Sequence, residues 1–296
     1  MVSAMKKTII LLSALAVALS CAKTPTPVET VDSAEMILSP IFPGESKATA
    51  AGFESGDKIG IYITKYNGET PSPLQIGGNW GSNLTLSYNG TNWALEPKVY
   101  WEDGKFDIYG YYPKMAVESV DAQPFQVASD QTVTGGIEGM DAYEASDFLW
   151  AKVKGVTRTG SVPMAFQHKM CKVNVSLIKG DDYEGDLPED AYVYIHSTVT
   201  EASIDLSTGD VVIDNHRPST SIKAKKTSLD HFEAIVVPQR LSNRVPLVEV
   251  VCGQVSYLFE STVIFKSGTQ HNITITLSDN PEKVAIDIGG QIENWG

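Results

Sequence analysis

One of the three cysteines in this chain stands where its thiol would be chemically modified. Cys21 closes the sequence ALSC, which ends the apolar run of residues 8–19, and the basic pair Lys6-Lys7 precedes that run. A basic start, a short apolar stretch and small residues before a cleavage point are typical of a secretory signal peptide. The run is also too short to cross a hydrocarbon layer of about 30 Å. We therefore predict a signal peptide at residues 1–20.

The ALSC sequence resembles a bacterial lipobox, in which a peptidase cuts before the cysteine and the cysteine sulfur carries a diacylglycerol. Ala18 stands where the usual pattern has leucine, a departure that looser lipoboxes tolerate. We predict a lipoprotein acylated at Cys21, whose palmitate-like chains each bury about 0.8 kcal/mol per CH₂ in a membrane. Residues 21–35, rich in Thr and Pro, would form a flexible tether. An ordinary signal peptide with a chance cysteine is the alternative.

Composition narrows the class of protein. Hydrophobic residues make up 42% of the 296 residues, which excludes a disordered chain. The formal net charge of −13 argues against nucleic acid as a partner, because phosphates require Lys and Arg. Loss of Lys6 and Lys7 with the signal would make the mature chain more acidic still. Cys171 and Cys252 lie in expected strands, where we favour buried free thiols over a disulfide.

The sequence contains no pattern typical of a catalytic, cofactor or metal site, so we predict neither an enzyme nor a bound cofactor. The histidines lack the HxH or HxxxH spacing of metal ligands. They are His168, His196, His216, His231 and His271. The acidic turn at residues 181–186 lacks the glycine and glutamate positions of an EF-hand. GxSxG, Walker and GxGxxG motifs are also missing from the sequence.

Alternation of apolar and polar residues dominates the chain beyond the signal and predicts β-strands. Residues 58–64, KIGIYIT, alternate and predict a half-buried strand. Asn89-Gly90 predicts a tight hairpin turn after the strand at 84–88. Only residues 141–148 favour a short helical segment. Further strands are expected at residues 106–112, 172–177, 191–196, 210–213, 232–237, 246–252, 254–260 and 271–277.

These elements predict an all-β fold of the antiparallel β-sandwich type. The polar, turn-rich stretch at 157–163 divides the chain into an N-terminal β-sandwich domain at 36–160 and a C-terminal one at 161–296. Between Met170 and Cys171 the apolar residues change phase, which predicts a bulge or bend at that point.

Several blocks of sequence, in order along nearly the whole chain, resemble the fimbrillin family, the Mfa-like and FimA-like pilus proteins of Bacteroidota. The order and spacing of the blocks together carry the resemblance. The blocks are GDKIG at 56–60, YW at 100–101, IYGYYP at 108–113, DFLWA at 147–151, FQHKMCKV at 166–173, VPQ at 237–239 and IENW at 292–295.

The resemblance implies two tandem transthyretin-like β-sandwich domains, export as an outer-membrane lipoprotein, and cell adhesion as part of a fimbrium, the type V pilus, at the cell surface. It also implies partners, namely other fimbrial subunits and a host or bacterial surface receptor. In polymerising members an arginine-directed protease cuts after the first strand, and a neighbour's donor strand fills the groove. In such strand addition, backbone hydrogen bonds give affinity and alternate side chains give register.

Two parts of the chain would carry this strand exchange. No arginine precedes Arg158, and Lys47 is the only basic residue in the loop after the first expected strand at 36–42, so Lys47 is the candidate processing site. The missing arginine favours an uncut anchor or accessory role over cleavage at Lys47. The donor strand would come from the C-terminal segment, which would otherwise complete the second domain. Its apolar residues are Val284, Ile286, Ile288, Ile292 and Trp295.

The alternative function is a glycan-binding surface lipoprotein of a polysaccharide-uptake system. Such a protein would use exposed aromatic side chains, for which Trp80, Trp93 and Trp101 are the candidates. The sequence leaves open whether a fimbrial subunit of this kind belongs to the shaft, the tip or the anchor.

Overall fold

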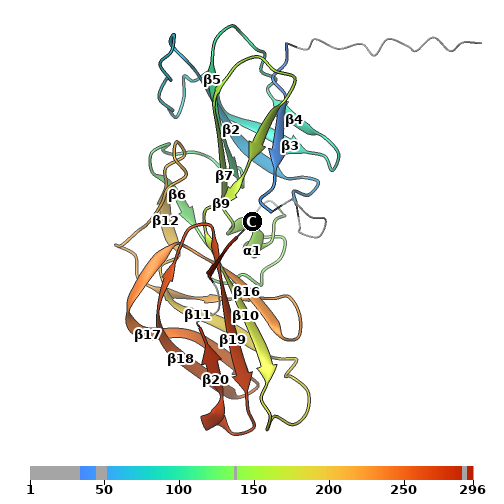
Figure 1. Cartoon of the computed structure of the whole chain (residues 1–296), viewed down its shortest axis with the longest axis vertical. Helices are drawn as coiled ribbons and strands as arrows, with labels where there is room; N and C mark the ends of the chain where they lie inside the picture. The colour runs from blue at the N-terminus through green and yellow to red at the C-terminus, as the bar shows by residue number, and fades with distance from the viewer. Residues whose placement is uncertain (1–33, 45–51, 137–138, 289–291, 296) are drawn as a thin grey trace, which may run out of the picture. The chain divides into compact units, whose positions relative to one another are not determined.

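The structure, a computed structural model, describes residues 34–44, 52–136, 139–288 and 292–295. Within these residues the fold is all-β with several antiparallel sheets (Figure 1). Residues 33–296 form one compact unit. The predicted sites Cys21 and Lys47 lie outside the described residues.

The elements up to residue 168 include one short helix, α1 (Ala142–Ala145), inside the stretch expected to be helical. The strands are β1 (Leu38–Ile41), β2 (Lys58–Lys65), β3 (Gly81–Tyr88), β4 (Trp93–Glu96), β5 (Phe106–Tyr112), β6 (Gln123–Gln126), β7 (Leu149–Val156), β8 (Val162–Ala165) and β9 (Gln167–His168).

The elements after residue 170 end with a short 3-10 helix, η1 (Pro281–Lys283), and two short strands. The strands are β10 (Cys171–Lys179), β11 (Tyr192–Thr198), β12 (Glu201–Ile204), β13 (Val211–Ile213), β14 (Thr220–Lys223), β15 (Lys225–Lys226), β16 (His231–Val236), β17 (Gln239–Cys252), β18 (Val255–Phe265), β19 (Thr269–Leu277), β20 (Ala285–Asp287) and β21 (Ile292–Asn294).

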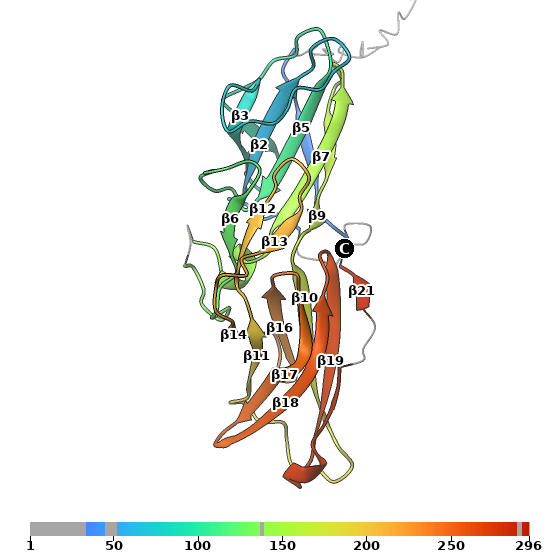
Figure 2. The ribbon, with the colours of Figure 1, turned by 90° about the vertical axis from the view of Figure 1, so that its left-hand side faces the viewer.

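The sheet with strand order β4-β3-β2-β5-β7-β9 is covered on both faces at its centre, in β2 and β5. Figure 2 shows β2, β5 and β7 side by side. The expectation that residues 58–64 form a half-buried strand is therefore wrong, because β2 is buried on both faces. Ile61 packs into one hydrophobic cluster and Tyr62 into another. Gly60 makes room on the second face, since a Cβ there would overlap the ring of Tyr111.

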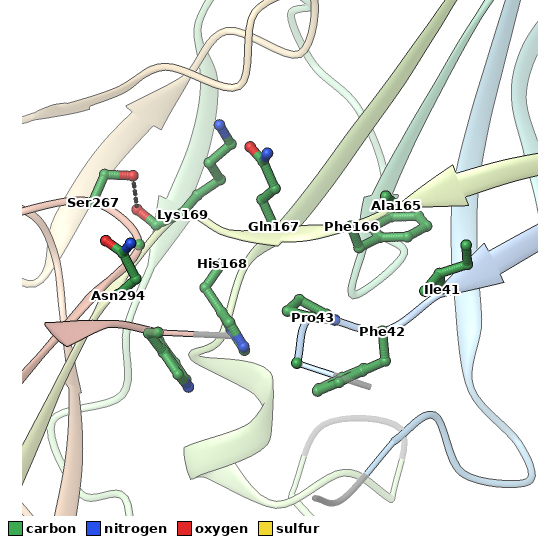
Figure 3. A pocket seen from close by; sticks show the side chains of 13 residues that line it. Ile41, Phe42, Pro43, Ala165, Phe166, Gln167, His168, Lys169, Ser267 and Asn294 are labelled. Carbon is green, nitrogen blue, oxygen red and sulfur yellow. Dashed lines mark hydrogen bonds between the residues drawn. The ribbon is translucent and has the colours of Figure 1, made fainter. Parts of the chain in front are cut away.

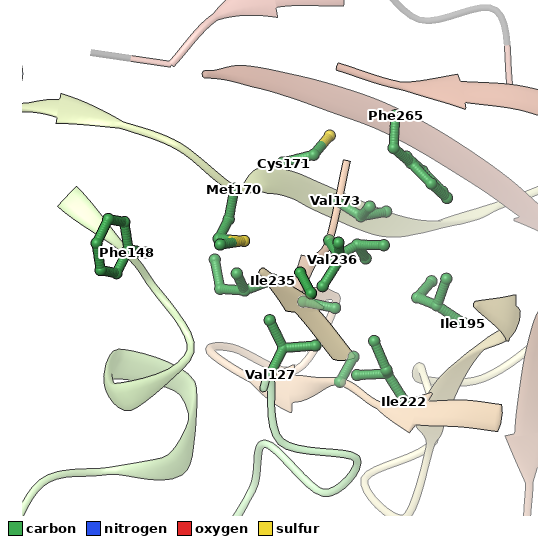
Figure 4. Packing of buried hydrophobic residues seen from close by; sticks show 14 of the residues in the cluster. Val127, Phe148, Met170, Cys171, Val173, Ile195, Ile222, Ile235, Val236 and Phe265 are labelled. Atoms are coloured by element: carbon green, nitrogen blue, oxygen red, sulfur yellow. The ribbon is translucent and has the colours of Figure 1, made fainter. Parts of the chain in front are cut away.

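Two hydrophobic clusters form the core. The first cluster joins β1 and β8 to one face of the β4-β3-β2-β5-β7-β9 sheet and includes Leu38, Ile61 and Met164. The second cluster includes Val173, Ile195 and Val236, which Figure 4 shows among the strands of the later part of the chain. Tyr62, Tyr109 and Phe148 from the earlier part also belong to this second cluster.

Three further sheets hold the later strands. Their orders are β15-β16-β10-β19-β20, with β21 also paired to β19, then β14-β11-β17-β18, and β13-β12-β6. Most pairs are antiparallel, but β10 and β19 run parallel. The predicted break between Met170 and Cys171 is confirmed, because β9 pairs with β7 while β10 belongs to a different sheet.

Two smaller expectations are also confirmed. Gly90 has a φ of 89°, as the predicted hairpin turn between β3 and β4 requires. Cys171 and Cys252 are free thiols rather than a disulfide. Burial raises the pKa of the Cys171 thiol to about 12.

Candidate functional site

Strand β1 and the two residues before it are held in the core by alternate side chains. Met36 and Leu38 are 1% and 3% exposed and pack in the first cluster, whereas Ile37 and Ile41 are 45% and 42% exposed. One edge of β1 pairs in parallel with β8. The backbone oxygens of Ile37 and Ile41 accept hydrogen bonds of 2.9 and 3.0 Å from the N–H groups of β8 and of the residue that follows it.

The opposite edge of β1 is only partly bonded. Met36 donates its N–H to the oxygen of Val99 at 2.8 Å. Beyond that bond a cavity of about 310 Å³, lined by Leu38, Leu86 and Leu95 among others, separates β1 from β4. Because backbone groups alternate between the two edges of a strand, the N–H and C=O of Leu38 face this cavity. Within the described residues they bond no other strand.

The C-terminal segment lies on β19 in this structure. Ile286 of β20 pairs with Ile275, and Asn294 of β21 pairs with Thr269. The described side chains of the predicted donor are partly buried against the second cluster. They are Val284, Ile286, Ile288 and Trp295. In this arrangement the segment extends the sheet that contains β19. This is the alternative to donor use that the sequence left open.

A ring stack holds the end of this segment. The Trp295 ring lies parallel to the ring of His168, with centroids 3.6 Å apart and planes 6° apart. His168 is itself fixed by a contact of 3.0 Å between its Nδ1 and Asp147. The sequence offered no signal for this contact, because His168 of β9 and Trp295, which follows β21, are far apart in the chain.

A polar cluster joins β5 to α1. The Tyr112 hydroxyl lies 3.1 Å from Asp57 and 2.5 Å from Glu144, and burial raises the pKa of both carboxyls. Burial also raises the pKa of Tyr112. Nearby, Tyr143 donates to Glu233 at 2.9 Å. These contacts bind α1 to β5 and to β16, which belong to different sheets.

The histidines and tryptophans singled out in the sequence lie in several parts of the fold, and Trp80 and Trp101 both pack against the ring of Phe106. Among the described residues no cluster of three or more His, Cys, Asp or Glu side chains could hold a metal ion. Trp101 is 7% exposed and so cannot serve as a surface platform. Trp93 stacks on Tyr88, and Trp80 is 38% exposed beneath the Lys65 ammonium. None of the described helices is long and apolar enough to cross a membrane.

The all-β fold and strand β1, whose alternate side chains are buried in the core, define a β-rich structural protein. The chain belongs to the fimbrillin-like family, which matches residues 46–295. This is a family of non-enzymatic adhesion proteins, so the chain is a fimbrillin-like protein of the cell adhesion and fimbrial class. Its family implies association with other fimbrial subunits and a place at the cell surface.

Solved structures share this fold. A candidate cell adhesion protein from Bacteroides uniformis is 21% identical, with a TM-score of 0.63 over 82% of this chain and 93% of its own. A second from Bacteroides ovatus is 19% identical, with a TM-score of 0.66 over 88% and 97%. A fimbrial protein from Bacteroides vulgatus is 14% identical, with a TM-score of 0.50 over 88% and 99%. No curated protein matches the chain.

Proposed function

We propose that this protein is a lipid-anchored fimbrial subunit, anchor or accessory protein of the outer membrane that joins its neighbours by β-strand exchange. Two tandem transthyretin-like domains, divided near residue 160, and a lipid on Cys21 belong to the proposal. The observation that supports it most directly is β1, whose side chains are buried in the core while the backbone of Leu38 lacks a neighbouring strand on one edge.

Burial of the β1 side chains favours replacement of β1 by another strand over removal of β1 alone. Burying a Met or Leu side chain is worth about 1.5–3 kcal/mol, so removal of Met36 and Leu38 would leave an unfavourable apolar groove. An incoming strand with apolar residues at every second position would restore this burial. Val284, Ile286 and Ile288 have that spacing. To act as a donor, the segment would first leave β19.

Cleavage after Lys47 would separate β1 from the rest of the chain. N-terminal sequencing of the protein from whole cells and from sheared fimbriae distinguishes the roles. A mature start at Cys21 in fimbriae indicates an uncut anchor or accessory subunit, and a start at Ala48 indicates a processed shaft subunit. A Lys47→Gln variant should abolish the second species only. Recovery of neither species from fimbriae would refute the proposed role.

Two further variants test the other parts of the proposal. Cys21→Ser should abolish incorporation of labelled palmitate and release the protein from the membrane. Deletion of residues 284–296 should leave monomers that no longer join fimbriae. Normal fimbriae built from the deleted chain would exclude this segment as the donor.

A further inference from the structure

Strand β18 forms one edge of the β14-β11-β17-β18 sheet. Its neighbour in this sheet is β17, and Figure 1 shows the two strands side by side. Within the described residues no other strand pairs with β18. Neither β1 nor the C-terminal segment belongs to this sheet, so the free edge of β18 does not rest on the proposed strand exchange.

The turn between β17 and β18 determines which backbone groups face the free edge. Cys252 and Val255 pair across a turn of two residues, and such a closing pair exchanges both of its hydrogen bonds. Because successive residues alternate, every second residue after Val255 points its N–H and C=O away from β17. These residues are Ser256, Leu258 and Glu260. Pro246 of β17 agrees with this assignment, since it lies opposite Glu260 and has no N–H to donate.

The outward backbone groups of these three residues have no partner in the described part of the chain. No hydrogen bond within the described residues reaches their N–H or C=O groups. All three residues are exposed. At the next outward residue, Thr262, the backbone oxygen already accepts from the Ser261 hydroxyl at 3.2 Å. We therefore call residues 256–260 the free edge.

The opposite end of β18 is tied to the rest of the molecule. The ring of His271 is hydrogen-bonded to the backbone of Ile264. Beyond this point the chain turns toward β19, and Ser267 donates its hydroxyl to the backbone oxygen of Lys169 at 2.9 Å (Figure 3). A strand that adds to β18 can therefore bond the free edge but not the end near Ile264.

The free edge lacks the usual protection against pairing. Natural edge strands are commonly shielded by Lys, by Pro or by a bulge. Strand β18 contains neither Lys nor Pro, and the irregularities of its ladder come from extra residues of β17. Its one charged residue, Glu260, already contacts Arg244 of the same chain at 3.5 Å. Leu258, in the middle of the free edge, is 52% exposed.

We propose that the free edge of β18 pairs with the same edge of a second copy of this chain, antiparallel about a two-fold axis at Leu258. In this register Leu258 lies opposite its counterpart, and Ser256 lies opposite Glu260. On the other face Tyr257 lies opposite Phe259, which gives a cross-strand aromatic pair on each side of the axis. About six backbone hydrogen bonds would form, because each hydrogen-bonded pair exchanges two.

The side chains of the edge favour a second copy in this register. Pairing buries Leu258 against an identical apolar side chain. A register centred on Glu260 would place two carboxylates directly opposite each other, which is destabilising. A register centred on Thr262 would need the backbone of Ile264, which is already bonded. A basic partner strand is less favoured, because Arg244 already contacts the one carboxylate of the edge.

The expected dimer is reversible. A contact made by one strand from each copy is small beside the roughly 1,200–2,000 Å² of stable interfaces. The two-fold axis also closes the assembly at two copies, since each copy uses the same surface. Pairing would therefore cover the free edge of β18 without producing an open fibre.

The test is sedimentation equilibrium of the full chain over a wide range of concentration, with Cys21→Ser to remove the proposed lipid. The chain should convert reversibly from monomer to dimer. Leu258→Lys should raise the dimer Kd about tenfold, because two ammonium groups replace the apolar contact at the axis. Ile264→Lys is the matched control. Ile264 is also apolar and exposed on β18 but lies outside the free edge, so its variant should leave the Kd unchanged.

A mixture of two variants tests the register. Leu258→Lys and Leu258→Glu should each associate poorly alone, whereas their mixture should form a mixed dimer, because opposite charges then meet across the axis. A mixture that stays monomeric would overturn the register. An unchanged Kd in Leu258→Lys, or equal weakening by Ile264→Lys, would overturn pairing at this edge. A chain that is monomeric at every concentration would exclude a second copy and leave the edge to a strand of another protein.

Discussion

Replacing Leu38 by alanine tests whether side-chain burial holds β1 in place. Leu38 is 3% exposed in the first cluster, and its own N–H and C=O bond no strand in the described part of the chain. A Leu→Ala change at a buried site costs about 2–5 kcal/mol. At about 2–4 °C per kcal/mol for a chain of this size, the Tm should fall by about 4–20 °C.

The neighbouring residue provides the control. Ile37 is 45% exposed, so Ile37→Ala should lower the free energy of unfolding by less than about 1 kcal/mol. Hydrogen exchange supplies a second measurement, because the N–H groups of Val162 and Phe166 donate to β1. These two amides should exchange faster in Leu38→Ala than in Ile37→Ala. Equal loss of Tm in both variants, or unchanged exchange, would refute the reasoning.

Three further predictions concern the core and its polar contacts. Gly60→Ala should cost about 1–3 kcal/mol in urea unfolding, because the new Cβ overlaps the Tyr111 ring; an unchanged midpoint would contradict this. Trp295→Ala removes the stack on His168, and hydrogen exchange should then accelerate in β21 but not in β20. Burial raises the pKa of Glu144 above 4.5, so its stabilising contribution is present at low pH and lost as pH rises through the raised value. The urea midpoint of Glu144→Gln should therefore rise relative to that of the wild type between pH 4 and pH 7. A constant difference between the two midpoints would contradict a pH-dependent contribution from this carboxyl.

Strands could be predicted from the local sequence where alternating apolar and polar residues correspond to one buried and one exposed face. Residues 106–112 were expected to form a strand and coincide with β5. The same logic failed for β2, because its second face is covered by residues distant in the chain. The local sequence places Tyr62 on the face of β2 expected to be exposed to solvent, yet its side chain is 1% exposed. Burial of its hydroxyl raises its pKa to about 12.

The site was less predictable than the strands. The sequence indicated that a strand near residue 38 and a C-terminal segment would matter. It did not indicate that β1 pairs in parallel with β8, since parallel partners are set by the tertiary path of the chain. The contact between His168 and Trp295 likewise required the folded chain.

The parallel pairing of β10 with β19 has a mechanical consequence. The chain enters this pair at Cys171 and leaves it at Leu277, which lie at opposite ends of the ladder. If neighbours in a fimbrium are joined through the C-terminal segment, tension would pull the two strands past each other along their length. Such shear loads the hydrogen bonds of the ladder together, whereas peeling breaks them one at a time. Under that load the subunit would therefore resist traction most strongly along the β10 and β19 strands.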